Sequence, residues 1–93
     1  MSKIGFIGMG KWDIAMLIGV LKVFEPSDII FTCPDLDKCK IISDETGVKY
    51  AESNAECANN AQYIVLAVKP QVYSAVMKNI VNVIREDSVV ISI

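Results

Sequence analysis

The chain has 93 residues, enough for one domain with a single hydrophobic core. Hydrophobic residues make up 53% of it, the formal net charge is −2, and there is no histidine. Histidine is the commonest metal ligand and the commonest general base at neutral pH, so we expect neither a metal site nor a catalytic residue in this chain. The 9 lysines and arginines are balanced by 11 acidic residues, which disfavours a nucleic-acid partner.

The cysteines and the apolar runs bear on the cellular compartment. Cys33, Cys39 and Cys57 contain no CxxC pair and predict free thiols rather than a disulfide or a zinc site. No export signal is evident at the N-terminus, and no apolar run reaches the roughly 18 residues that cross a membrane. We therefore expect a cytoplasmic protein with no membrane partner.

Short β-rich runs alternate with helical stretches, which favours an α/β domain with a parallel sheet. A continuous apolar strand is expected over 3–8, followed by a helix over 11–24 that stops at Glu25-Pro26-Ser27. The next elements are a strand over 28–32 and a helix over 36–46, with Gly47 as its stop. The remaining elements are a strand over 49–51, a helix over 54–60 capped by Asn54, a strand over 63–68, a helix over 71–85 and a strand over 88–93.

Five strands joined by right-handed crossovers take the order 3-2-1-4-5 in a Rossmann-like, three-layer domain with helices on both faces. Because no repeat or linker interrupts the chain, we expect a single domain over 1–93. A ligand would bind where the strand order reverses, beyond the ends of the first and fourth strands, at residues 8–10 and 67–70.

The turn after the first strand carries the paired glycines of a dinucleotide-binding loop, Gly8 and Gly10. The third glycine of that pattern is replaced by Asp13, whose carboxylate would compete with a phosphate for the same helix N-terminus. At an effective dielectric near 20, two unit charges about 5 Å apart repel by roughly 3 kcal/mol. The loop therefore indicates dinucleotide-binding ancestry with weakened binding.

Five stretches resemble the N-terminal part of the pyrroline-5-carboxylate reductases: KIGFIGMG (3–10), FTCPDLDK (31–38), ETGVKYAESNAE (45–56), LAVKPQV (66–72) and DSVVISI (87–93). The resemblance implies an oxidoreductase of proline biosynthesis whose domain binds NADPH, or NADH in some members. It also implies that a helical catalytic and dimerisation domain is absent from this chain. The second strand ends at Thr32-Cys33 with no acidic residue, which mildly favours NADPH.

The resemblance places cofactor contacts on the phosphate loop, the end of the second strand and the loop after the fourth. The implied residues are Ile7, Gly8, Met9, Gly10, Lys11, Trp12, Cys33, Pro34, Asn54, Ala67, Val68, Lys69 and Pro70. Asp13 directly follows the phosphate loop, and its carboxylate would compete with the cofactor phosphates. We therefore expect little or no NADP(H) to bind here.

The departures from the family cluster in one helix, where Lys11-Trp12-Asp13 replaces Asn-Met-Ala or Asn-Met-Gly, and we interpret the chain as a redesigned fragment. Projected at 100° per residue, one apolar side holds Trp12, Ala15, Met16, Gly19 and Val23, which we expect to face the sheet. The opposite stripe predicts a homodimer interface made of Ile14, Leu17, Ile18, Leu21 and Phe24. The alternative is that Leu17 and Leu21 belong to a wide core face.

Three functional hypotheses follow. The first is a redesigned, catalytically inactive domain that self-associates through its first helix. The second is a remnant that binds NADP(H) without turning it over. The third is the NADP(H)-binding domain of a functional pyrroline-5-carboxylate reductase. Asp13 favours the first over the second.

Overall fold

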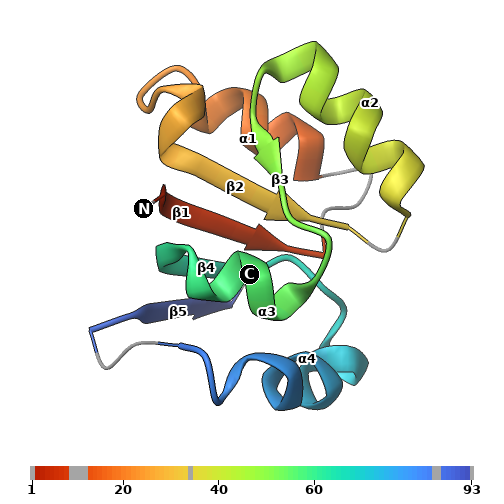
Figure 1. The fold of residues 1–93 in the computed structure, drawn as a ribbon, viewed down its shortest axis with the longest axis vertical. Coiled ribbons are helices and arrows are strands. Elements are labelled where there is room, and N and C mark those ends of the chain that lie inside the picture. The colour runs from red at the N-terminus through yellow and green to blue at the C-terminus, as the bar shows by residue number, and fades with distance from the viewer. Residues whose placement is uncertain (1, 9–12, 34, 85–86, 93) are drawn as a thin grey trace.

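The structure, a computed structural model, describes residues 2–8, 13–33, 35–84 and 87–92. A parallel five-stranded sheet has the order β3-β2-β1-β4-β5, which confirms the predicted Rossmann-like topology (Figure 1). Its strands are β1 (Ser2–Ile7), β2 (Ile29–Thr32), β3 (Lys49–Tyr50), β4 (Ala61–Leu66) and β5 (Val89–Ser92). The α-helices are α1 (Asp13–Val20), α2 (Leu36–Thr46), α3 (Asn54–Asn59) and α4 (Tyr73–Ile80), with short 3-10 helices at η1 (Pro26–Asp28) and η2 (Pro70–Val72).

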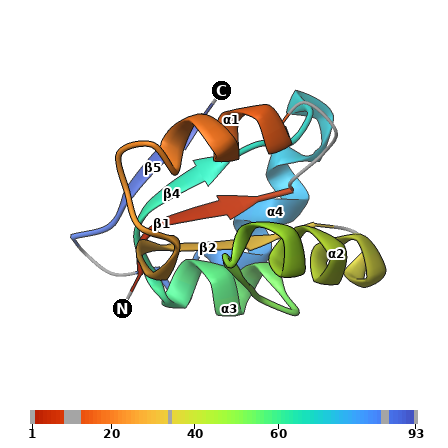
Figure 2. The ribbon, with the colours of Figure 1, turned by 90° about the horizontal axis from the view of Figure 1, so that it is seen from above.

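The sheet separates two hydrophobic clusters, and Figure 2 shows α1 on one side of the strands and α3 on the other. On the α1 side, Phe6 and Phe31 pack with residues of α1 and α2. On the α3 side, Ile7 and Ile64 pack with residues of α3 and α4. Gly5 lets α3 come close to the sheet, because a Cβ there would lie 3.2 Å from the Sγ of Cys57 in α3 and 2.8 Å from the Cβ of Ala61 at the start of β4.

The ends of the helices follow local signals. Helix α2 spans the predicted residues and stops at Gly47, whose φ of 77° is left-handed and whose N–H donates to the carbonyl of Ser43. Helix α3 begins at the expected residue, Asn54, but its N-cap is Ser53, one residue before the predicted cap. The Ser53 hydroxyl accepts the backbone N–H of Glu56 at 3.1 Å. Among the described residues, none of the helices has the length and apolar character that a bilayer span requires.

The predicted orientation of α1 is wrong for Leu17, whereas Met16 packs against the core as expected. Leu17, expected on the outer stripe, is 0% exposed and belongs to the core cluster. Leu21 and Phe24 are partly buried against the same cluster, so the alternative of a wide core face holds. Conversely, Val23 was expected to face the sheet and is 80% exposed. The large side chains face inward because they remove more apolar area from water than Ala15 and Gly19 would.

Two residues of the proposed outer stripe remain to be placed. Ile18 is 52% exposed, as expected for that stripe. The side chain of Ile14 lies outside the described part of the structure. The continuous interface predicted on α1 is therefore reduced, among the described side chains, to the single exposed residue Ile18.

The prediction of three free thiols is also wrong. Cys33 and Cys39 form a disulfide across the turn between β2 and α2, and Cys57 is the free cysteine. The turn sets the two Cα atoms 6.1 Å apart, within the range that a disulfide spans. The six-residue spacing in the sequence does not reveal this turn geometry.

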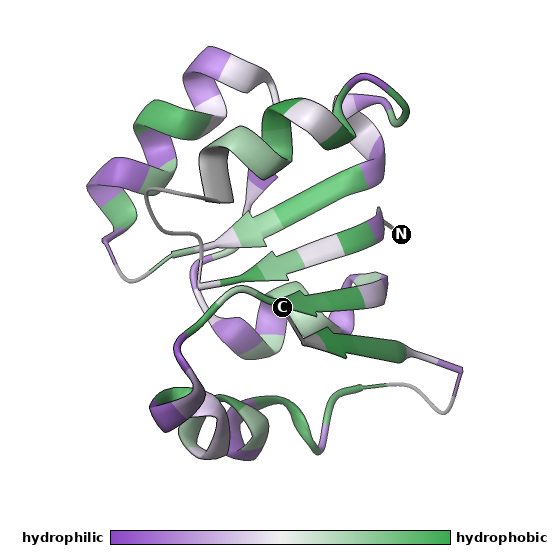
Figure 3. Ribbon diagram, turned by 180° about the vertical axis from the view of Figure 1, so that it is seen from behind, coloured by the Kyte–Doolittle hydropathy of each residue, from purple (hydrophilic) through white to green (hydrophobic). Residues whose placement is uncertain are grey.

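One half of the sheet is left open on the α1 side. Tyr63 of β4 and its β5 neighbour Val89 are 42% and 45% exposed, and Ile91 is 41% exposed. Tyr63 and Ile91 line a groove together with Lys3, Ile4, Phe24 and Val65. Figure 3, seen from this side, shows hydrophobic strands β4 and β5 with no described helix over them.

Candidate functional site

A cavity of about 390 Å³ lies at the C-terminal ends of β1 and β2, beside the chain that leaves β3 and β4. Strand order reverses between β1 and β4, and ligands of such folds bind outside the strand ends at that point. The lining residues are Ile7, Gly8, Thr32, Cys33, Glu52, Ser53, Asn54, Val68, Val72 and Val76. This cavity occupies the position that the topology predicts for a dinucleotide.

Gly8 fixes the shape of the cavity at its centre. Its N–H donates to the carbonyl of Thr32 at 2.9 Å, and the Ala67 N–H donates to the carbonyl of Ile7 at 2.9 Å. Gly8 has a φ of 82°, and a Cβ there would overlap the Cγ1 of Val68. In a dinucleotide-binding loop the first glycine makes the tight turn that leaves the strand, and the left-handed Gly8 packed against Val68 fits that role.

The structure gathers five of the residues implied by the resemblance around the cavity: Ile7, Gly8, Cys33, Asn54 and Val68. Ala67 is half-buried beside them and does not line the cavity. Lys69 and Pro70 are exposed and also lie outside the lining. Met9, Gly10, Lys11, Trp12 and Pro34 lie outside the described residues, as does the side chain of Asp13. Cofactor contact by any of these residues stays a prediction.

Sequence reasoning missed half of the lining. Thr32 is the last residue of β2, while Glu52 and Ser53 come after β3, separated from it by Ala51. Their positions at strand ends are the signal that could have identified them, because the ends of parallel strands meet at one edge of a sheet. Val72 ends η2 and Val76 lies in α4, and both add apolar side chains to the lining.

Cys57 lies in the core between α3 and the sheet and takes no part in the cavity. Its thiol is close to the carbonyl of Phe6, with a sulfur–oxygen distance of 3.6 Å. Burial, reinforced by the charge of Glu56, raises the pKa of the Cys57 thiol from 9.0 to about 12. The thiol is therefore protonated at neutral pH and is not a nucleophile.

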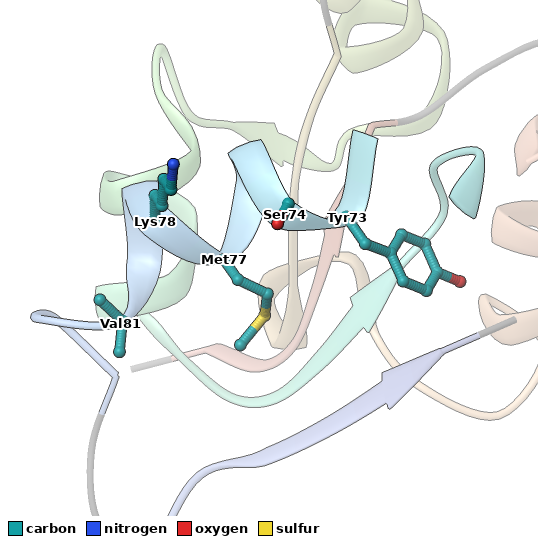
Figure 4. Close-up of a pocket in the computed structure, with 5 residues that line it drawn as sticks. All are labelled: Tyr73, Ser74, Met77, Lys78 and Val81. Carbon is teal, nitrogen blue, oxygen red and sulfur yellow. The ribbon is translucent and has the colours of Figure 1, made fainter. Parts of the chain in front are cut away.

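A second groove of about 460 Å³ runs along α4 and is lined by Tyr73, Ser74, Met77, Lys78 and Val81 (Figure 4). It shares no lining residue with the cavity at the strand ends. The groove presents mostly apolar side chains and one lysine, and it lacks the backbone turn that approaches a phosphate. The cavity at Gly8 is therefore the better candidate for a functional site.

Comparisons with known proteins show the family to which the chain belongs. The family model described as NADP oxidoreductase coenzyme F420-dependent matches residues 3–93. The pyrroline-5-carboxylate reductase of Escherichia coli K12 is 38% identical over 94 residues, which cover 99% of this chain and 35% of that protein. The reductase of Methanosarcina acetivorans is 34% identical over the same shares.

Solved structures give the same result. The pyrroline-5-carboxylate reductase of Coxiella burnetii superposes with a TM-score of 0.88 and 32% identity, over 99% of this chain and 35% of that one. The Plasmodium falciparum enzyme, determined with NADP bound, gives a TM-score of 0.75 and 28% identity, over 99% of this chain and 33% of that one. The chain thus spans about a third of the length of these relatives. It belongs to the NADP oxidoreductase, coenzyme F420-dependent family, and it matches the dinucleotide-binding domain of the pyrroline-5-carboxylate reductases.

Proposed function

We propose that this chain is the nicotinamide-dinucleotide-binding domain of a pyrroline-5-carboxylate reductase, an oxidoreductase of proline biosynthesis. The observation that carries the proposal is the cavity at the reversal of strand order, where Gly8 has a φ of 82° and no space for a Cβ. The NADP bound to the Plasmodium falciparum relative supports the same class of ligand.

Each part of the cavity has a role in this proposal. Gly8 makes the tight turn that opens the phosphate-binding loop, while Val68 and Val76 offer apolar contact to the ligand. Thr32, Ser53 and Asn54 offer polar groups that orient the ribose end. When bound, the cofactor supplies the hydride, so this domain needs no nucleophile or acid–base pair of its own.

We infer that the 93 residues alone do not reduce the substrate. The chain spans about a third of the length of its relatives, and the resemblance assigns the substrate site to a further, helical domain. Redesign of the first helix and a location in the cytoplasm stay hypotheses.

Self-association is a second candidate, with a different surface from the one expected. The burial of Leu17 removes the centre of the predicted α1 interface. The open groove beside Phe24, with Tyr63 and Ile91, is the apolar surface that supports a twofold dimer instead. Sedimentation at several concentrations tests it: we expect a dimer that Ile91→Asp converts to monomer. A monomer at hundreds of micromolar would end the proposal.

Calorimetric titration tests the binding function. We expect NADH or NADPH to bind the chain and Asn54→Ala, in the cavity, to weaken binding several-fold. The matched control is Asn79→Ala on the exposed side of α4, which should leave the affinity unchanged. If neither dinucleotide binds up to about 1 mM, the proposed function is wrong.

A further inference from the structure

The disulfide between Cys33 and Cys39 has one end at the candidate cavity and the other in the core. Cys33 directly follows β2 and lines the cavity, and 8% of its surface is exposed. Cys39 of α2 is 0% exposed and packs in the cluster that contains Phe31 and Val48. A reagent in solution therefore reaches the bond from the cavity, on the side of Cys33.

The turn that carries the bond is also held by hydrogen bonds. The Cys39 N–H donates to the carbonyl of Asp35 at 3.0 Å, and the Gly8 N–H donates to the carbonyl of Thr32, the residue before Cys33. The bond itself joins residues only six positions apart, and a short loop constrains the unfolded chain less than a long one does. We therefore expect the chain to fold with the bond open.

The site offers partners for two thiols as well as for the bond. The carbonyl oxygen of Asp35 lies 3.1 Å from the Sγ of Cys33, and the carbonyl oxygen of Cys33 lies 3.7 Å from the Sγ of Cys39. Each freed S–H thus has an acceptor without any rearrangement of the backbone. The buried thiol of Cys57, beside the carbonyl of Phe6, is an example of this arrangement in the same chain. Both redox states therefore fit the folded chain.

Opening the bond changes the cavity. Bonded sulfurs lie about 2.05 Å apart, whereas nonbonded heavy atoms separate to roughly 3.5–4 Å. Cys39 is fixed in the packed core, so the displacement falls on Cys33. The space beside Cys33 is the cavity of about 390 Å³. The reduced thiol of Cys33 therefore enters the volume that a ligand would occupy.

We propose that Cys33 and Cys39 are a reversible redox pair that controls ligand binding in the cavity, with the disulfide form binding a dinucleotide more tightly than the dithiol form. The inference rests on the proposed function, which supplies the class of ligand. The reaction at the pair is a thiol–disulfide exchange, and its co-reactant is a small dithiol.

The exchange takes place in two steps. One sulfur of the small dithiol, as the thiolate, attacks the Sγ of Cys33; the bond to Cys39 breaks, and the Cys39 sulfur leaves with the electron pair and takes up a proton. The second sulfur of the reagent then attacks the first, which breaks the bond to Cys33 and closes the reagent into a cyclic disulfide. The pair thus gains two electrons and two protons, and the dithiol supplies both. The reverse reaction closes the bond.

The first measurement is a calorimetric titration of the whole chain with NADPH, once in the disulfide form and once in an excess of reduced dithiothreitol. We expect the disulfide form to bind about five-fold more tightly. Equal affinities, or tighter binding by the reduced chain, would overturn the inference and leave the proposed function intact. If NADPH binds neither form up to about 1 mM, the proposed function fails and the inference with it.

The second measurement uses the reciprocity of the two equilibria. The chain is equilibrated in mixtures of reduced and oxidised dithiothreitol, its free thiols are blocked with iodoacetamide, and mass spectrometry counts them. Saturating NADPH should raise the ratio of reduced to oxidised reagent at the midpoint by the same factor that separates the two affinities, about five-fold. A midpoint that NADPH does not move would overturn the coupling between the pair and the cavity.

The third measurement assigns the effect to the bond. Cys39→Ser removes the bond without changing the cavity lining, and its hydroxyl keeps a donor for the carbonyl of Cys33. We expect this variant to bind NADPH like the reduced chain, with or without dithiothreitol, and Cys33→Ser to lose the redox dependence as well. The control Cys57→Ala leaves the pair intact and should keep the five-fold difference. A redox difference that survives in Cys39→Ser would overturn the role of the bond.

Discussion

Gly8 and Val68 lie against each other at the C-terminal ends of β1 and β4, with no space between them for a Cβ. Gly8 also has a left-handed φ of 82°, which side chains other than glycine rarely adopt. Two independent constraints thus keep this turn free of a side chain. They act at the point where the strand order reverses and where a dinucleotide would bring its phosphates.

Gly8→Ala should destabilise the domain by about 2–4 kcal/mol, because it adds backbone strain to an overlap with Val68. Urea unfolding followed by circular dichroism measures the loss. Adding Val68→Ala should recover part of it, since the overlapping methyl is then gone. Gly19→Ala is the matched control: a Cβ at Gly19 meets nothing within 4 Å, and the change should stabilise α1 by about 0.5–1 kcal/mol. If Gly8→Ala is as stable as the parent chain, the steric account fails.

The corrected orientation of α1 gives a second prediction. Leu17→Ala should cost about 2–5 kcal/mol, because it opens a cavity in the core. Ile18→Ala, one residue further along the same helix, should change stability by no more than about 0.5–1 kcal/mol, since Ile18 is 52% exposed. The two unfolding curves in urea can be compared directly. A larger loss for Ile18 than for Leu17 would restore the orientation that the sequence suggested.

The thiol of Cys57 predicts a dependence of stability on alkaline pH. Its pKa is about 12 in the folded chain and 9.0 as the unperturbed value, so the folded state holds the proton more tightly. The stabilisation is complete below pH 9.0 and is lost as the pH rises toward 12, with a slope of at most about 1.4 kcal/mol per pH unit. Urea unfolding at a series of pH values above 9.0 measures it. Cys57→Ala removes this group, so the free energy of unfolding of the variant should fall less steeply as the pH rises. Parallel pH curves for the variant and the parent chain would contradict the assignment.

The disulfide between Cys33 and Cys39 predicts the number of reactive thiols. Without reductant, one thiol per unfolded chain, that of Cys57, should react with an aromatic disulfide reagent. After reduction and removal of the reductant, three thiols per chain should react, matching the three cysteines of the sequence. The folded chain should react slowly, because burial and the raised pKa protect Cys57. Three thiols in the chain as purified from non-reducing buffer would show that the bond is absent.

Much of the fold could be predicted, because its signals are local. Helix α2 has an N-cap at Asp35 and a stop at Gly47, and both behave as their residue types predict. The sheet order follows from apolar strands separated by helices and from the right-handed crossover rule. Ser53 and Asn54 are both good caps, so the sequence could not decide which of them starts α3.

Contacts between residues distant in sequence decide which face of α1 is buried and which residues line the cavity. The helix has two apolar sides, and only the volume available beside the sheet decides that Leu17 faces inward. Glu52 becomes part of the cavity through the pairing of β3 with β2, a contact between separate strands. The bond from Cys33 to Cys39 likewise depends on the turn that joins β2 to α2.

The central position of β1 has a consequence for how the chain folds as it is made. Ser2 pairs with Ala61, and β1 finds its second neighbour only in β4. A ribosome therefore releases the middle strand of the sheet long before both of its partners exist. Such long-range pairings slow folding, since a long loop must close before the contact forms. Until β4 emerges, the apolar strand at the N-terminus has one side of its backbone unpaired, and this interval is when the nascent chain is most exposed to aggregation.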